Sequence, residues 1–260
     1  GVFAAAELHG PSAEDLSIYQ ITQQASRFGI ATRVSPGAAD ARSALFFHYL
    51  SDSSQDHGAL ATPFALLTLA ATRSAASLRF DAEPDAFDVL RASLNDRRDR
   101  LAALFDDFAV ARLGLGKKRG FLGLGDAALA PRLAWDIEER SLPRQLVLSD
   151  PFEPTGSVYV RVHADEPLHD PIAVRIGCEK PVSYVWSIVG FDSKGHELSH
   201  VRIAFQERGS DFDQHVIPHD GTTSLVVVGT NLGGIDLDHP FDPDHAPLEA
   251  HSCSVYLTKI

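Results

Sequence analysis

Methionine is absent from this 260-residue chain, cysteine occurs only twice, and no apolar run is long enough to cross a membrane. Because Met is also missing at position 1, where Gly1 stands, we expect a processed chain rather than a complete translation product. Basic residues are outnumbered, 23 against 35 acidic ones, and the formal net charge is -12. This balance predicts no nucleic-acid partner and no polybasic membrane-binding patch.

The residues that are present are typical of a folded globular protein, with 44% hydrophobic and 22% charged side chains. Their pattern changes near residue 145. Before it, Ala, Leu, Arg and Asp recur at helical spacing, whereas Val, Ile, Thr and Tyr alternate with polar residues after it. We therefore predict an α+β protein of two domains, with an α-helical domain over 1–126, a linker over 127–150 and an antiparallel β-sandwich over 151–260.

The first half contains five predicted helices. The caps and apolar spacing place them at about 12–28, 38–50, 60–73, 84–94 and 97–113. In the fifth helix, the Leu and Phe residues form the expected buried stripe. Asp106 and Asp107 are expected on its solvated face.

The second half contains about seven predicted strands. Alternation and turn signals place them at 157–163, 172–179, 182–191, 198–206, 212–218, 223–231 and 253–260. Cys178 and Cys253 share the phase of inward-facing apolar residues, so both are expected to face the sandwich core. A disulfide between them would imply an oxidising compartment, and two buried free thiols are the equal alternative.

The segment from His196 to His200 reads HELSH, the HExxH motif of zinc peptidases. On a helix, His196 and His200 would bind zinc and Glu197 would act as the general base. Here the motif follows a turn and precedes an alternating, strand-like segment. On a strand the two imidazoles are separated by roughly 13 Å. We therefore predict a solvated strand face, and keep the zinc site as the alternative.

An acidic loop follows the Asn-Leu-Gly-Gly turn at residues 231–234. Its four carboxylates belong to Asp236, Asp238, Asp242 and Asp244. Hard oxygen ligands on irregular backbone suit calcium, although the spacing is not that of an EF-hand. Calcium is therefore the candidate cofactor of this loop, and a solvated acidic surface is the other interpretation.

Four segments of the first half (SALFFHYLSD, ATPFALLTLAATRS, EPDAFDVLRASL and DDFAVARLG) resemble the helical region of bacterial secreted metallopeptidases of the thermolysin-like, or gluzincin, type. The resemblance spans roughly residues 37–113 and implies a helical region followed, in some members, by a C-terminal β-sandwich. The family's HExxH helix precedes this region, whereas no HExxH occurs here before residue 196. No catalytic residue is therefore carried over.

Together these observations predict a secreted or envelope-associated bacterial protein that is built like the C-terminal part of a metallopeptidase. We expect it to be non-catalytic, with a sandwich that binds a protein or cell-surface partner or an upstream part of its own precursor. One alternative is a zinc metallopeptidase that uses residues 196–200. Another is a structural or assembly subunit of a larger complex. The sequence identifies neither a substrate nor an oligomeric state.

Overall fold

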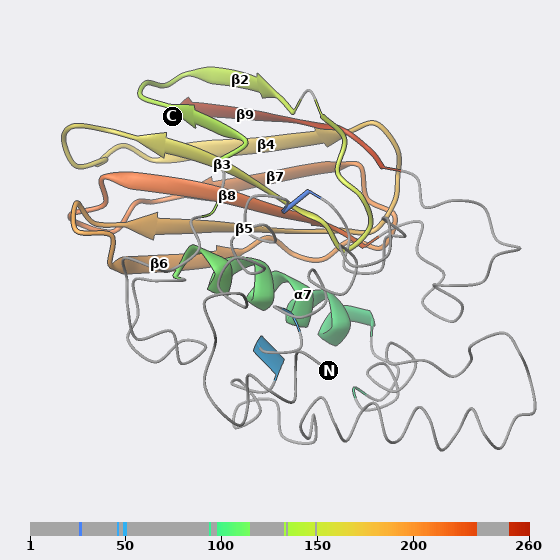
Figure 1. Cartoon of the computed structure of the whole chain (residues 1–260). Helices are drawn as coiled ribbons and strands as arrows, with labels where there is room; N and C mark the ends of the chain where they lie inside the picture. The colour runs from blue at the N-terminus through green and yellow to red at the C-terminus, as the bar shows by residue number, and fades with distance from the viewer. Residues whose placement is uncertain are drawn as a thin grey trace, which may run out of the picture.

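The computed structural model describes residues 26–27, 46, 49–50, 94, 98–114, 133, 135–148, 150–232 and 250–260. These residues form two β-sheets packed face to face and one helix that lies against the outside of one sheet (Figure 1). In this part of the chain, no helix is both long enough and apolar enough to span a membrane.

The first sheet, sheet A, has the strand order β1-β3-β8-β5-β6. Its strands are β1 (Ile137–Glu139), β3 (Ser157–His163), β5 (Tyr184–Phe191), β6 (Glu197–Arg202) and β8 (Ser224–Asn231). The β1–β3 pair is parallel and the other pairs are antiparallel. Strands β5 and β8 are buried along almost their whole length. Strands covered on both faces have continuous apolar sequences, as in the LVVVG segment of β8.

The second sheet, sheet B, has the order β2-β9-β4-β7, and all its pairs are antiparallel. Its strands are β2 (Arg144–Val147), β4 (Ile172–Cys178), β7 (Asp211–Val216) and β9 (Cys253–Lys259). Along β9, buried side chains alternate with half-buried ones. One face of sheet B therefore packs on sheet A, and the other is open to solvent in the described structure.

The core lies between the two sheets and is centred on large aromatic side chains. Trp186 and Tyr184 of β5 face Phe212 of β7, with ring centroids 6.3 and 6.4 Å from the Phe212 ring, and Phe152 packs on the same cluster. Valine, leucine and isoleucine from both inward faces fill the space around these rings. Burial of this apolar surface is the main stabilising contribution to the sandwich.

The helix α7 (Arg98–Leu113) covers the outward face of sheet A, across β5 and β8 (Figure 1). Ala109 and Leu113 pack on Tyr159 of β3 and on valines of β5 and β8. The Tyr159 hydroxyl donates a hydrogen bond of 2.9 Å to the Ala109 carbonyl oxygen. The helix is thus held against the sandwich by both apolar and polar contacts.

The other side of α7 is buried against aromatic residues from the start of the chain. The Phe46 ring stacks on Phe105 with centroids 5.1 Å apart and meets Phe108 edge-on at the same distance. Tyr49 packs on Phe108 as well, at 5.4 Å. Because α7 is covered on two sides, its sequence has apolar residues on more than one face.

The expected fold class, an N-terminal helical domain followed by a separate sandwich, is wrong. The described structure is mostly β, with two sheets, and α7 is the only helix whose bounds lie within the described residues. The helix is part of the sandwich because its apolar stripe is buried on sheet A rather than within a helical bundle. The other four expected helices fall outside the described residues, except for a few isolated positions.

The seven expected strands correspond to β3 through β9, with ends shifted by a few residues. Strands β1 and β2 lie in the segment 127–150 that the sequence analysis treated as a linker. Each adds an edge to one sheet, since β1 pairs with β3 and β2 pairs with β9. Their short length explains why no alternation was visible in the sequence.

Gly229 is a position where the core accepts no side chain. A Cβ atom there would lie 2.1 Å from Cζ3 of Trp186, which stands opposite it in the β5–β8 ladder. We expect Gly229→Ala to lower the free energy of unfolding by about 2 kcal/mol, because the indole ring must move in a packed core. Urea denaturation followed by tryptophan fluorescence measures this.

Gly177 of β4 provides the matched control for this variant. A Cβ at Gly177 would approach no atom closer than 3.5 Å. Gly177→Ala should therefore change the free energy of unfolding by no more than about 0.5 kcal/mol. Equal losses in the two variants would contradict the packing of Trp186 described above.

Candidate functional site

A cluster of four polar side chains lies between α7 and the outward face of sheet A. Asp106 of α7 meets Ser187 of β5 and two residues of β6, His200 and Arg202. The Ser187 hydroxyl donates to Asp106 Oδ2 at 2.7 Å, and Arg202 Nε donates to the same oxygen at 2.5 Å. His200 Nε2 lies 2.9 Å from Ser187 Oγ. Arg202 also pairs with Asp107, the next residue of the helix.

The strand register explains why these groups meet. Ser187 is paired with Arg202, and Val189 with His200. The side chains of Ser187, His200 and Arg202 therefore point to the same face of sheet A. Asp106 stands four residues after Ala102 and three before Ala109, within the buried stripe of α7. The helix therefore places a carboxylate on the polar positions of β5 and β6.

The cluster contains the residue types of a serine hydrolase but not their arrangement. In a catalytic triad, histidine lies between the two other groups, accepting from serine through one nitrogen and donating to the carboxylate through the other. Here Ser187 lies between Asp106 and His200, and its one proton is donated to the carboxylate. His200 Nε2 is 3.9 Å from Asp106 Oδ2, so the same nitrogen faces both groups. His200 therefore does not connect Ser187 to the carboxylate as the histidine of a triad does.

Burial separates Ser187 and Asp106 from any substrate, whereas the side chains of His200 and Arg202 are 25% and 34% exposed. Ser187 and the Asp106 side chain have no exposed surface. Burial raises the pKa of the Asp106 carboxyl, while hydrogen bonds from Arg202 and Ser187 and the nearby charges act in the opposite direction. Within the described structure, the other carboxyl oxygen, Oδ1, is buried without a hydrogen-bond partner. These features are typical of a structural polar contact that fixes a helix on a sheet.

The raised pKa of Asp106 predicts a specific pH dependence. A carboxyl whose pKa is higher in the folded state than its ordinary value of 3.8 stabilises the fold most at low pH, and this stabilisation is lost as the pH rises through the raised pKa. As the pH rises from 3.8 through the raised pKa of Asp106, the free energy of unfolding of the wild type should fall relative to that of Asp106→Asn. Denaturant titrations of both proteins at matched pH values test this, and parallel curves would contradict it.

The HExxH segment lies on the edge strand of sheet A, in an extended conformation. Glu197 and His200 belong to β6, and His196 immediately precedes it. His196 Nδ1 contacts Asp192 Oδ2 at 2.9 Å, whereas the His200 ring is directed to Ser187 under α7. Among the described residues, no group of three or more His, Cys, Asp or Glu side chains is placed to hold a metal ion.

The candidate calcium ligands Asp236, Asp238, Asp242 and Asp244 lie outside the described residues. The structure therefore provides no geometry for this loop.

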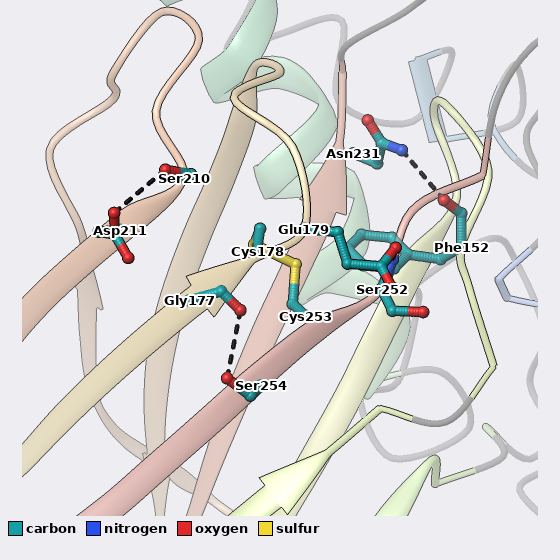
Figure 2. The surroundings of a disulfide bond; sticks show 10 residues. All are labelled: Phe152, Gly177, Cys178, Glu179, Ser210, Asp211, Asn231, Ser252, Cys253 and Ser254. Atoms are coloured by element: carbon teal, nitrogen blue, oxygen red, sulfur yellow. Dashed lines mark hydrogen bonds between the residues drawn. A yellow bond between two sulfur atoms is a disulfide. The ribbon is translucent and has the colours of Figure 1, made fainter.

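Cys178 and Cys253 form a disulfide. They are directly opposite each other in the β4–β9 ladder, with Cα atoms 4.0 Å apart, at one end of sheet B. Cys253 is buried and Cys178 packs against the sandwich core, as the phase of the two strands predicted. Figure 2 shows the disulfide together with the neighbouring residue of each strand, Gly177 before Cys178 and Ser254 after Cys253.

A hollow of about 310 Å³ opens on the outward face of sheet B next to the disulfide. The register aligns Ser254, Gly177 and Asp211 in one row across β9, β4 and β7, and Tyr256, Arg175 and Asp213 in the next row. Together with Ile176 and Phe212, these six residues line the hollow. It exists because Gly177 has no side chain between its neighbours.

Sequence reasoning missed the polar cluster because Asp106 was assigned to a solvated helix face. Its position within the Ala102, Phe105 and Ala109 stripe was the available signal. The partners Ser187, His200 and Arg202 are distant in sequence, and only the pairing of β5 with β6 brings them together. The hollow was also missed, because it depends on the alignment of three strands.

No known protein family matches the sequence, and no curated protein matches it. Among solved structures, the pre-peptidase C-terminal domain of a collagenase from Bacillus anthracis is similar over 49% of this chain and 99% of its own, with 5% identity and a TM-score of 0.32. The surface-associated copper-binding protein CorA of Methylomicrobium album BG8 is similar over 49% of this chain and 99% of its own, with 10% identity and a TM-score of 0.29. Both TM-scores are below 0.5.

Proposed function

We propose that this chain is an extracytoplasmic, non-catalytic binding protein, built like the C-terminal part of a bacterial secreted metallopeptidase. In this proposal the sandwich binds a partner, and the HExxH segment at residues 196–200 takes no part in catalysis. The observation that carries the non-catalytic part of the proposal is the cluster of Asp106, Ser187, His200 and Arg202, in which Ser187 and Asp106 are fully buried and the four groups contact one another.

The geometry of the cluster supports a structural role for each member. His196 Nδ1 contacts Asp192 Oδ2, whereas His200 Nε2 contacts Ser187 Oγ, so the two imidazoles have different partners. They are separated by four residues of extended backbone, which places them too far apart to bind one zinc ion together. The backbone of β6 therefore supports the structural role of His200 over the peptidase alternative.

The disulfide supports the extracytoplasmic location. Disulfides form and persist in oxidising environments such as the periplasm and the outside of the cell, and they are rare in the cytosol. Cys178 and Cys253 lie opposite each other on neighbouring strands, where the bond closes a stretch of the chain with a sequence separation of 75 residues. A disulfide of this kind is typical of a β-sandwich located outside the cytosol.

Zinc content after dialysis against micromolar zinc tests the proposal against the peptidase alternative. We expect well under one zinc per chain, with the same value in the wild type and His196→Ala. His215→Ala is the matched control, since His215 is an exposed histidine on another edge strand. One zinc per chain that is lost in His196→Ala and retained in His215→Ala would overturn the proposal.

A further inference from the structure

We infer that the hollow on the outward face of sheet B binds a hexose residue of a neutral glycan. This inference rests on the proposed binding function and specifies its ligand. The hollow combines a glycine in its floor, a partly exposed aromatic ring and charged hydrogen-bonding groups of both signs.

The floor of the hollow is formed by small residues beside the disulfide. Gly177 lies between Ser254 and Asp211, and a Cβ there would be 3.5 Å from Ser254 Oγ and 3.7 Å from Asp211 Oδ1. The Ser254 hydroxyl donates to the Gly177 carbonyl oxygen at 3.3 Å (Figure 2). The volume of about 310 Å³ is at the lower end for small-molecule sites, which suits one ring rather than a long peptide.

The polar groups around this floor match the chemistry of sugar hydroxyls. Asp211 accepts from Ser210 Oγ through Oδ2 at 3.1 Å (Figure 2), while its Oδ1 would lie 3.7 Å from a Cβ atom at Gly177. Arg175 pairs with Asp213 at 3.3 Å, and both side chains are more than half exposed. A hydroxyl both donates and accepts, so one sugar ring can donate to the carboxylates and accept from the guanidinium.

The arrangement of charges favours a neutral ligand. A cationic ligand would face Arg175, which pairs with Asp213, and an anionic ligand would face Asp211 and Asp213. The half-buried ring of Tyr256, next to Arg175 in the ladder, offers an apolar surface of the kind that packs on the C–H face of a pyranose.

The backbone of the site is held in place before any ligand binds. Its residues lie on paired strands, and the disulfide joins the ends of β4 and β9 one residue beyond Gly177 and Ser254. Little backbone entropy is therefore lost when a ligand enters, which lowers the cost of binding.

Chemical-shift titration of the full ¹⁵N-labelled chain tests the inference. The probes are neutral hexasaccharides of glucose, mannose and galactose, with hexagalacturonate and tetralysine as charged comparisons. We expect a neutral hexasaccharide to shift the amide signals of Gly177, Asp211 and Ser254. Gly177→Val, which fills the floor, and Asp211→Asn, which removes a charged acceptor, should each weaken binding about tenfold or more.

Thr258→Val is the control, because Thr258 lies on the same face of β9 but does not line the hollow. It should bind within about twofold of the wild type, and thermal midpoints establish that all three variants fold. Binding of tetralysine or hexagalacturonate alone, binding unaffected by the two site variants, or no binding of any neutral sugar would each overturn the inference. None of these outcomes contradicts the proposed non-catalytic function, because the zinc measurement tests that proposal separately.

Discussion

Replacing both Cys178 and Cys253 by alanine is expected to lower the free energy of unfolding by about 4 kcal/mol. The bond joins residues separated by 75 positions in the sequence, so its removal returns a large amount of conformational entropy to the unfolded chain. Guanidinium denaturation of the oxidised wild type and of the double variant measures the difference. The sandwich should still form at low denaturant, because the core packing does not involve these sulfur atoms alone.

A reductant gives the internal control for this effect. Dithiothreitol should shift the denaturation midpoint of the wild type toward that of the double variant and leave the variant unchanged. If the oxidised and the reduced wild type unfold at the same denaturant concentration, the disulfide does not stabilise the sandwich, which would contradict the prediction.

Asp106→Ala is expected to cost about 3 kcal/mol of stability, the lower end of the range for breaking a buried charged contact. The variant removes the acceptor of both the Ser187 hydroxyl and Arg202 Nε and leaves a cavity between α7 and sheet A. The loss stays at the lower end because Arg202 is a third exposed and retains Asp107. Chemical denaturation measures the free energy, and hydrogen exchange of the α7 amides reports where the structure loosens.

Asp107→Ala is the matched control, one residue along the same helix. Its carboxylate is a third exposed and contacts Arg202 at the surface, so its removal should cost less than about 1 kcal/mol. Similar losses in Asp106→Ala and Asp107→Ala would show that the buried contact with Ser187 has no special weight, contrary to the structure presented here.

The strands were predictable because their signals are local. In β9, the alternation of CSVYLTK identifies one buried face, and the structure confirms it. In β8, the continuous apolar run indicated a strand, but not what covers its second face. The covering element is α7, which arrives from a distant part of the sequence. The fold class was therefore mispredicted, although this helix and seven of the nine strands in the described residues were found.

The polar cluster could not be predicted because its partners are set by tertiary contacts. Aspartate is usually exposed, and only the position of Asp106 within the apolar stripe of α7 indicates its burial. The HExxH string shows the opposite case. Its residue types suggested a metal site, whereas the extended backbone of β6 turns His200 toward Ser187. Residue type identifies candidate chemistry, and the backbone decides which groups meet.

The central claim is that Asp106, Ser187 and His200 hold α7 on sheet A and carry out no reaction. The most direct measurement is labelling of the folded wild-type protein with a fluorophosphonate, which reacts with activated serines, followed by peptide mass spectrometry. We predict no modification of Ser187, because its side chain is fully buried between α7 and sheet A. Stoichiometric modification of Ser187 that disappears in His200→Ala would contradict the account and identify a hydrolase.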